Sequence, residues 1–362
     1  MKCSDLIKII NISKIVSKGA EKMTVLYAGI DVSKDKFDVS FTTNGKRVFN
    51  YSVYSNEKKG IKSFFKKALI LMKKENCNKI HFIMESTGIY HCGLCEYLQE
   101  HSDHIVSVIN PVQTKSFSKS LMLRTKNDKV DSSMLAQYGF YHNPKSTPKM
   151  PETLKHFRSL VRLRDALIEE RTRKIAQLKS SLDKRVQNYI ERSIKFTEKE
   201  IEKLENEIKE LIKNDEYLSR QISLLKTVDA ISDTTAWKLF SEVKVNSENI
   251  NPKAQAANAG LMPREFSSGS SVRGRTHISR MGNRSIRKSL YMPALSCIKN
   301  QNYFYDFYNR LVENGKPKKS AVTAVMRKIL VTAMGVLKNQ QPFDPNWSEK
   351  TREKYLKNLK IA

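Results

Sequence analysis

Alternating and continuous apolar runs shape the first part of the chain. Residues 25–32 form an apolar run, and two β-rich runs follow that are joined at Asn44-Gly45, the dipeptide most typical of a tight hairpin. The pattern then predicts a helix over about 56–74, a buried strand over 80–84 and another strand over 105–109. A three-strand meander followed by alternating helices and strands is an α/β order.

The segment over residues 143–151 separates this part from a different pattern. Its three prolines interrupt any helix, so we interpret it as a linker. Beyond it, apolar residues recur at every seventh position, which is typical of long amphipathic helices. The first run has Leu154, Val161, Ile168, Ile175 and Leu182, and the second has Ile194, Ile201 and Ile208 with Leu204, Leu211 and Leu218.

These two helices could pair within one chain or between chains, because a period alone does not choose the partner. Thr197 and Glu200 match a capping box, which predicts a helix start there. Most of the charges form a solvated face. Six arginines could nevertheless lie along a nucleic-acid backbone: Arg158, Arg162, Arg164, Arg171, Arg173 and Arg185.

The last third of the chain is predicted to be mainly helical. An apolar segment covers residues 236–243, and helices are expected over 285–297, 303–313 and 320–337. Aromatic residues cluster over 303–308 at helical spacing, which favours core packing over base stacking.

Composition narrows the class of protein. The chain has 362 residues, enough for two or three domains, and 65 Lys and Arg against 37 Asp and Glu give a net charge of +28. Such an excess favours nucleic acid or another polyanion as partner, although a solvated basic surface would have the same composition.

The five scattered cysteines do not resemble a disulfide framework and indicate a reducing cytosol. Cys92 and Cys95 lack a second ligand pair at finger spacing, so core packing is the better interpretation. Residues 1–22 lack an uninterrupted apolar stretch, and we expect neither export nor a spanning helix. This extension is either an appended helix or a product of start-site choice.

Four carboxylates come from three predicted elements. Asp31 lies within the first strand, Glu85 ends a later one, and Asp128 and Asp131 share one face at the start of a helix. If the two strands are neighbours, these oxygens could converge on Mg²⁺. For each acid alone there is an ordinary alternative: Asp128 caps the helix, and Asp131 and Glu85 pair with lysines.

A second constellation reads PREFSSGSSVRGRTHISRMGNRSIRK over residues 263–288. Four serines surround one glycine. The segment also contains seven basic residues, most of them after the serines, and Glu265 is its single acid. This is the charge pattern expected where a chain meets phosphate. The basic residues are Arg264, Arg273, Arg275, Arg280, Arg284, Arg287 and Lys288.

Five blocks occur in one order: YAGIDVSKDKFDV, MESTGIY, VINP, RTKNDKVDSSMLA and GLMPREFSSGSSVRG. They resemble the DEDD-type transposases of a bacterial insertion-sequence family, which are bridge-RNA-guided serine recombinases, and the resemblance spans about residues 27–344. It implies a RuvC-like, RNase H-type domain, a coiled-coil insertion and a mainly α-helical transposase domain. The expected divisions are an extension over 1–22, these three domains over 23–146, 147–222 and 223–345, and a basic tail over 346–362.

The resemblance also implies roles for single residues. Asp31, Glu85, Asp128 and Asp131 match the four acids that hold Mg²⁺ against the scissile phosphate, and Ser268 matches the nucleophile. From the sequence alone, Ser267, Ser270 and Ser271 would be equally good candidates. A serine attacks a phosphodiester poorly unless a metal and basic groups stabilise the developing anion, and the acids and arginines supply both needs.

The implied partners are donor DNA, target DNA and an element-encoded bridge RNA that pairs with both, while the protein holds backbones. The resemblance further implies a homo-oligomer, a dimer that becomes a tetramer in the synaptic complex, in which one subunit's serine meets another's acids. We expect a cytoplasmic, nucleoid-associated bacterial protein without a membrane partner.

One departure and two alternatives complete the sequence-based picture. Where the family shows a Pro-Gly-Ile-Gly turn, residues 227–232 read TVDAIS, which lacks the glycines that let a backbone approach phosphate.

Two alternative functions fit parts of the sequence. The first alternative is a metal-dependent nuclease or Holliday-junction resolvase that uses water. The second is a nucleic-acid-binding protein without catalysis.

Overall fold

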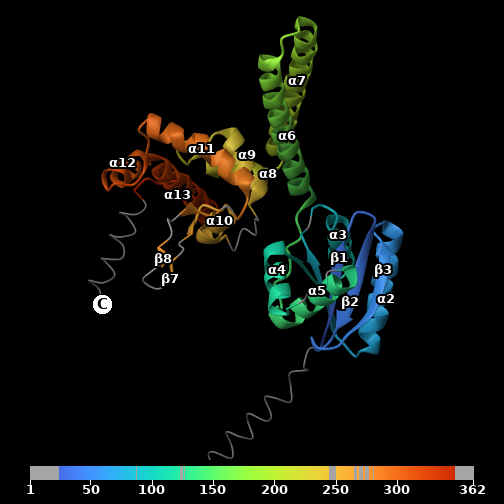
Figure 1. Cartoon of the computed structure of the whole chain (residues 1–362). Coiled ribbons are helices and arrows are strands. Elements are labelled where there is room, and N and C mark those ends of the chain that lie inside the picture. The colour runs from blue at the N-terminus through green and yellow to red at the C-terminus, as the bar shows by residue number, and fades with distance from the viewer. Residues whose placement is uncertain are drawn as a thin grey trace, which may run out of the picture. The chain divides into compact units, whose positions relative to one another are not determined.

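The computed structural model describes residues 24–346, apart from 87, 123–124, 126, 244–249, 265–266, 269–271, 274–276 and 280, and gives only the backbone of 267–268, 272–273 and 277. The predicted extension over 1–22 and all but the first residue of the predicted tail over 346–362 lie outside the described residues. The chain forms two compact units, Met1–Lys149 and Met150–Ala362 (Figure 1). The finer division into domains stays a prediction.

The first unit is built on one mixed sheet with the order β3-β2-β1-β4-β5. β1 pairs with β2 antiparallel and with β4 parallel, so the first three strands form the predicted meander and the later strands the predicted α/β part. Gly45 adopts a φ of 71° in the β2–β3 turn, as the Asn44-Gly45 signal predicts. The strands are β1 (Val25–Val32), β2 (Lys36–Thr42), β3 (Val48–Ser55), β4 (Lys79–Glu85) and β5 (Ile105–Ile109).

Helices cover both faces of this sheet and create two separate cores. α2 (Lys58–Lys74) and α3 (Cys92–His101) pack on one face, where the core contains Leu26, Phe37 and Phe82. Cys95 is buried on this side while Cys92 is exposed, which agrees with core packing for Cys95 alone. The other face carries α5 (Asp128–His142) and α4 (Pro111–Ser120), whose smaller core includes Ile83 and Leu135.

A glycine in β1 allows α5 to lie very close to the sheet. A Cβ atom on Gly29 would stand 2.1 Å from the backbone nitrogen of Ala136 and 2.2 Å from the carbonyl oxygen of Ser132. One helical turn further on, Gly139 faces Ile83 with the same lack of room. Because neither glycine has a side chain, the helix axis approaches the strands and its first turn reaches the end of β1.

The predicted linker contains no helix or strand, but it is held against the first unit. The backbone N–H of Thr147 donates to the carbonyl of Val106 at 2.7 Å, and its hydroxyl accepts from the N–H of Val108. This part of the linker therefore follows the outer edge of β5 and covers its free hydrogen-bonding groups.

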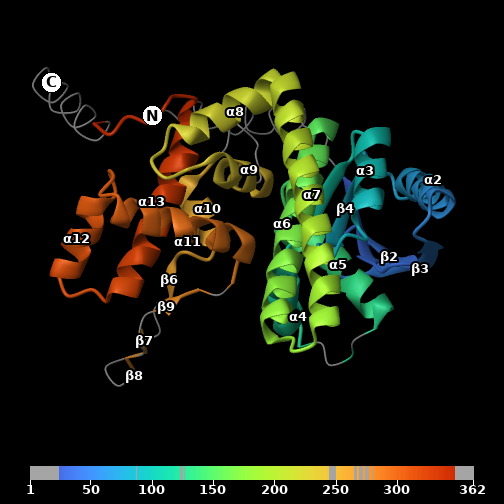
Figure 2. The ribbon, with the colours of Figure 1, turned by 90° about the horizontal axis from the view of Figure 1, so that it is seen from above.

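The second unit is helical, with four two-residue strands that form two short ladders between α10 and α11. α6 and α7 pack side by side as a long hairpin, so the two amphipathic helices pair within one chain (Figures 1 and 2). The three helices predicted near the end are confirmed as α11, α12 and α13. The helices are α6 (Glu152–Ser180), α7 (Lys184–Asn214), α8 (Glu216–Lys226), α9 (Asp233–Glu242), α10 (Pro252–Asn258), α11 (Arg284–Lys299), α12 (Tyr305–Glu313) and α13 (Lys318–Asn339).

α13 is the described helix whose length and composition would suffice to cross a membrane. Its apolar side chains, among them Ala321, Val325 and Ile329, are buried in the core of the second unit. That burial accounts for its hydropathy, as is usual for the central helix of a helical unit. Phe304 is also fully buried, which agrees with core packing for the aromatic cluster.

Three predictions about the hairpin are wrong. α6 ends before Leu182, which is fully exposed in the turn. α7 continues through Thr197, whose buried hydroxyl donates to the carbonyl of Ser193 one turn earlier, so no helix starts there. Leu218 lies in α8 and belongs to the core of the second unit. A heptad pattern does not show where a turn interrupts it.

The close approach at Gly29 can be tested by adding one methyl group. We expect Gly29→Ala to lower the free energy of unfolding by about 3 kcal/mol, because the new Cβ meets backbone that cannot rotate away. Gly93→Ala is the control, since nothing lies within 4 Å of its added Cβ in α3 and helix propensity favours alanine by up to about 1 kcal/mol. Equal stability of the two variants in urea unfolding would contradict the contact.

Candidate acidic active site and serine loop

The four predicted acids lie at one end of the sheet in the first unit. β1 and β4 are parallel neighbours, with Ile30 opposite Met84. Asp31 and Glu85 are the next residues on these two strands and therefore lie at adjacent strand ends. Both are half-buried. The sequence-based condition that these two strands be neighbours is therefore met.

The first turn of α5 supplies the other two acids. Asn127 caps this helix by accepting a hydrogen bond from the N–H of Val130 at 2.8 Å, so the alternative in which Asp128 is the cap is wrong. Asp128 and Asp131 lie in the first turn, where the helix dipole favours negative charge.

The charge of Asp31 is the clearest sign that these groups are close together. Burial, and after it repulsion from Asp131, Asp128, Asp38 and Glu85, together raise the pKa of its carboxyl to about 6. A carboxyl affected by four others marks a concentration of negative charge that suits a cation.

Asp38 is a fifth acid, which the sequence reasoning missed. It lies on β2 directly opposite Asp31, is 2% exposed, and accepts a hydrogen bond from the hydroxyl of Tyr51. Lys36, the first residue of β2, lies 3.3 Å from Asp38 and 2.7 Å from Asp128. A signal was present: Asp38 and Ser40 alternate with apolar residues along β2 and so face the same side of the sheet.

Glu85 is held by a second residue that the sequence did not indicate. The hydroxyl of Thr114, in the first turns of α4, donates to its carboxylate at 2.6 Å and is itself buried. Asn110 caps α4 and Pro111 begins it, which sets the position of Thr114. Contacts across 29 residues of chain are invisible to local patterns.

The donor set fits a hard divalent cation in chemistry, because carboxylate oxygens are what Mg²⁺ prefers. Its arrangement does not yet enclose one: within the described ranges, no group of three or more His, Cys, Asp or Glu side chains is placed to hold a metal ion. The ammonium group of Lys36 hydrogen-bonds to a carboxylate oxygen of Asp128, one of the four predicted acids.

The serine loop belongs to the second unit and consists of two short ladders. β6 (Pro263–Arg264) pairs with β9 (His277–Ile278), and β7 (Ser267–Ser268) pairs with β8 (Val272–Arg273). Ser268 stands opposite Val272 in the backbone register. The side chains of Ser267, Ser268 and Arg273, together with Ser270, Ser271, Arg275 and Arg280, lie outside the described residues.

The base of this loop is fastened by backbone contacts. The N–H of Asn283 donates to the carbonyl of Asn258 at 2.6 Å, and that of Ser279 donates to Met262 at 3.0 Å. Gly282 has a φ of 126°, and a Cβ there would lie 2.4 Å from the Asn258 oxygen. The chain therefore enters and leaves the loop at one point.

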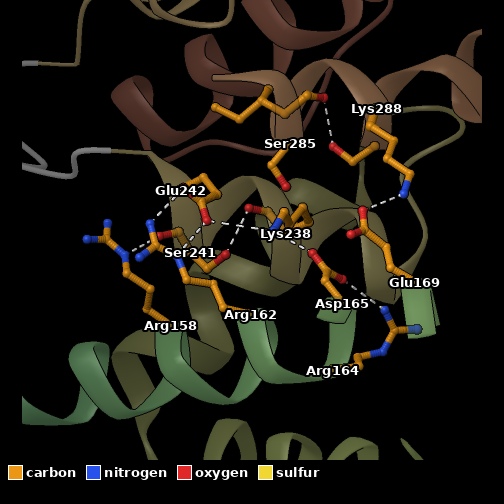
Figure 3. A network of polar contacts seen from close by, with 12 residues as sticks. Arg158, Arg162, Arg164, Asp165, Glu169, Lys238, Ser241, Glu242, Ser285 and Lys288 are labelled. Atoms are coloured by element: carbon orange, nitrogen blue, oxygen red, sulfur yellow. Dashed lines mark hydrogen bonds and ion pairs between the residues drawn. The ribbon is translucent and has the colours of Figure 1, made fainter. Parts of the chain in front are cut away.

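A network of charged side chains, in which Lys238 and Glu242 are buried, connects this base to α6 and α9 (Figure 3). Glu242 accepts hydrogen bonds from Arg162 at 2.9 and 3.1 Å and from the side-chain amide of Asn283 at 2.9 Å. Lys238, also buried, pairs with Asp165 and lies 3.6 Å from Glu242. Burial opposes the charge of Glu242, but these donors prevail and lower its pKa to about 2.

The predicted phosphate-binding residues occupy different settings. Arg264 and Arg284 are exposed, whereas Arg287 donates to the carbonyl of Ala259 at 2.8 Å and Lys288 pairs with Glu169 of α6 at 2.8 Å. Several arginines of α6 likewise have protein partners. Arg158 donates to the carbonyl of Ser241, Arg162 to Glu242 and Arg164 to Glu205.

The turn over residues 227–232 connects α8 to α9. Val228 and Ile231 are buried in the core of the second unit, and Ala230 takes a φ of 68° that a glycine would adopt more easily. Contact between this turn and DNA stays a prediction.

The raised pKa of Asp31 predicts a pH-dependent cost. Because the folded protein holds this proton more tightly than the unfolded chain does, ionisation lowers stability as pH rises from about 4 to 6 and the loss persists above that range. After allowance for solvent screening, we expect Asp31→Asn in EDTA to gain about 1–2 kcal/mol at pH 7.5 and nothing at pH 4. Asp103→Asn, on an exposed turn, should change neither value. A gain independent of pH in urea unfolding would refute this account.

The charge network predicts a large effect of one substitution. Glu242→Ala leaves Lys238 and Arg162 without their shared partner, and we expect the second unit to lose about 3 kcal/mol of stability at pH 7. Glu210→Ala, an exposed glutamate on α7, should cost less than about 0.5 kcal/mol. Calorimetry of both variants tests this, and equal unfolding temperatures would count against the network.

Comparison with known proteins agrees with this organisation. Residues 28–186 match a family described as "Transposase", and residues 222–309 match the "Transposase IS116/IS110/IS902 family". Pilin gene-inverting proteins of Moraxella lacunata and Moraxella bovis are each 32% identical over 330 residues, which cover 89% of this chain and 98% of theirs.

Among solved structures, T. thermophilus RuvC in complex with Holliday junction substrate covers 33% of this chain and 95% of its own, at 12% identity and a TM-score of 0.26. The chain belongs to the IS116/IS110/IS902 family of transposases, which are DNA-rearranging enzymes.

Proposed function

We propose that this protein cuts and rejoins donor and target DNA through a covalent phosphoserine intermediate, with Mg²⁺ at the acidic site of the first unit. The observation that carries the proposal is the repulsion of Asp31 by acids from β2, β4 and α5, which marks a cation site built from distant segments. The names of the Moraxella relatives, pilin gene-inverting proteins, support a rearrangement in which DNA ends are rejoined.

Each residue has a defined part in the chemistry. The hydroxyl oxygen of Ser268 forms a bond to the scissile phosphorus and loses its proton, while the bond from phosphorus to the 3′ oxygen breaks and that oxygen leaves as a hydroxyl. Asp31, Glu85, Asp128 and Asp131 would hold Mg²⁺, which when bound withdraws charge from the phosphate. The basic residues of the serine loop offset the developing anion. Because a phosphoester replaces a phosphoester, rejoining needs no external energy.

The fold expectations fit this proposal. A five-stranded sheet with three antiparallel strands followed by two parallel ones is the arrangement expected of a RuvC-like, RNase H-type domain, and the α6–α7 hairpin is in the place of the expected coiled-coil insertion. Asp31 lies near the end of β1, the central strand of this sheet.

Sequence choice is proposed to come from a bridge RNA that pairs with donor and target DNA. The protein then needs mainly to hold phosphate backbones, for which its charge of +28 is suited. The acids and the serine lie in different compact units, which is compatible with a homo-oligomer, dimeric and then tetrameric, in which one subunit's serine works with another's acids. The setting is the bacterial cytoplasm, at the nucleoid.

The alternative function that the acidic site also supports is a metal-dependent nuclease or junction resolvase, because the acids with a bound metal would activate water without any serine. It requires no serine adduct. A binding protein without catalysis would require neither the acids nor the serine.

One experiment distinguishes the serine recombinase from the water-using nuclease and from the non-catalytic binding protein. Purified protein is incubated with Mg²⁺, RNA transcribed from the DNA flanking its gene, and end-labelled donor and target DNA. We expect a protein-linked DNA band that protease removes, present in Ser267→Ala, Ser270→Ala and Ser271→Ala and reduced at least about a hundredfold in Ser268→Ala. Asp31→Asn should abolish the band together with all cutting.

Other outcomes have definite meanings. Cleavage without an adduct, unchanged in Ser268→Ala, identifies the water-using nuclease. Loss of the band in one of the three neighbouring variants instead moves the nucleophile to that serine. Binding without cleavage by the parent protein identifies the non-catalytic alternative.

A further inference from the structure

Lys36 is a cation placed inside the acidic site, and neither the proposed chemistry nor the family match assigns it a role. Its ammonium group lies 2.7 Å from Asp128 and 3.3 Å from Asp38, and so joins the start of β2 to the first turn of α5, 92 residues away in sequence. Among the ion pairs of the described residues, it is the lysine that bridges two carboxylates of this site.

One partner of Lys36, Asp38, is itself held firmly in place. Asp38 is almost completely buried and accepts the hydroxyl hydrogen of Tyr51, and Lys129 in turn lies over the ring of Tyr51 at 5.6 Å. Asp38 is therefore held by burial and by a contact that does not involve Asp128. The side chain of Lys36 is half-exposed, with room to turn on this anchor.

Asp128, in contrast to the buried Asp38, is largely exposed to solvent. Its side chain is 53% exposed, its carboxylate is turned to Lys36, and this hydrogen bond is the first cause of its lowered pKa. A magnesium ion binds a carboxylate oxygen at about 2.1 Å. One carboxylate oxygen cannot approach an ammonium group and a divalent cation at such distances without strong repulsion between the two cations.

We propose that Lys36 is a tethered cation that competes with the divalent ion for Asp128, so that the acidic site stays internally neutralised until the metal displaces it. The proposal rests on the proposed function, because it assumes that Asp128 is a metal ligand. Displacement leaves Lys36 anchored on Asp38 at the rim of the site. In the absence of metal, the same contact positions the first turn of α5.

The test measures binding of Mn²⁺, as a spectroscopic substitute for Mg²⁺, to the full-length protein without nucleic acid. Lys36→Met removes the competing charge, and Lys36→Arg retains it. Lys34→Met is the matched control, since it removes one positive charge from the β1–β2 turn, two residues before Lys36. We expect Lys36→Met to bind Mn²⁺ roughly tenfold more tightly than the parent, and Lys36→Arg and Lys34→Met to stay within about threefold of it.

Thermal unfolding in EDTA gives a second readout. Lys36→Met should unfold at a lower temperature than Lys34→Met, because the repulsion among Asp31, Asp38 and Asp128 is then unrelieved. Addition of Mn²⁺ should raise its unfolding temperature by more than it raises that of the parent. A merely structural lysine would lower stability without any gain in metal affinity.

The outcomes distinguish this inference from the proposed function. If the parent binds Mn²⁺, Asp31→Asn does not, and Lys36→Met binds no more tightly than Lys34→Met, then the metal site stands and the competition is refuted. Weaker binding by Lys36→Met also refutes it. If neither the parent nor any variant binds Mn²⁺, the metal part of the proposed function fails and the inference fails with it.

Discussion

The packing of α5 onto β1 at Gly29 is the contact on which the acidic site depends. The helix backbone occupies the space that any other residue would need for its side chain. Only this close approach brings Asp128 and Asp131 over the end of β1, where their charges act on Asp31. Acids a hundred residues apart form one site because a residue without a side chain lies between their elements.

Concentrating carboxylates in this way costs folding free energy, and the first unit offsets part of the cost with specific donors. Tyr51 and Lys36 bind Asp38, and Thr114 binds Glu85. The cost that is left appears in the raised pKa of Asp31, which a cation would relieve. Under the proposed function, stability without metal and affinity for metal therefore oppose each other, as is common where strain is kept at a functional site.

The sequence predicts the periodic and local features well, because strand alternation, the Asn44-Gly45 turn and the prolines of the linker act over a few residues. It also places Asp31 within one strand and Glu85 at the end of another, while the pairing of those two strands comes from the structure. It could not reveal Lys36 or Thr114, whose partners come from other elements. The failed capping box at Thr197 has the same cause, since packing of α7 on α6 overrides a local signal.

In the second unit, the charge network around Glu242 shows how a costly arrangement can be retained for position. Apolar side chains of similar volume would stabilise such a site equally well, so stability alone does not explain it. What they could not do is bind Asn283, whose side chain caps α11 and donates to Glu242 while its backbone holds Asn258. One residue thus ties α6, through Arg162, to the base of the serine loop. Because hydrogen bonds fix direction as well as distance, this network sets the position of the loop base against α6.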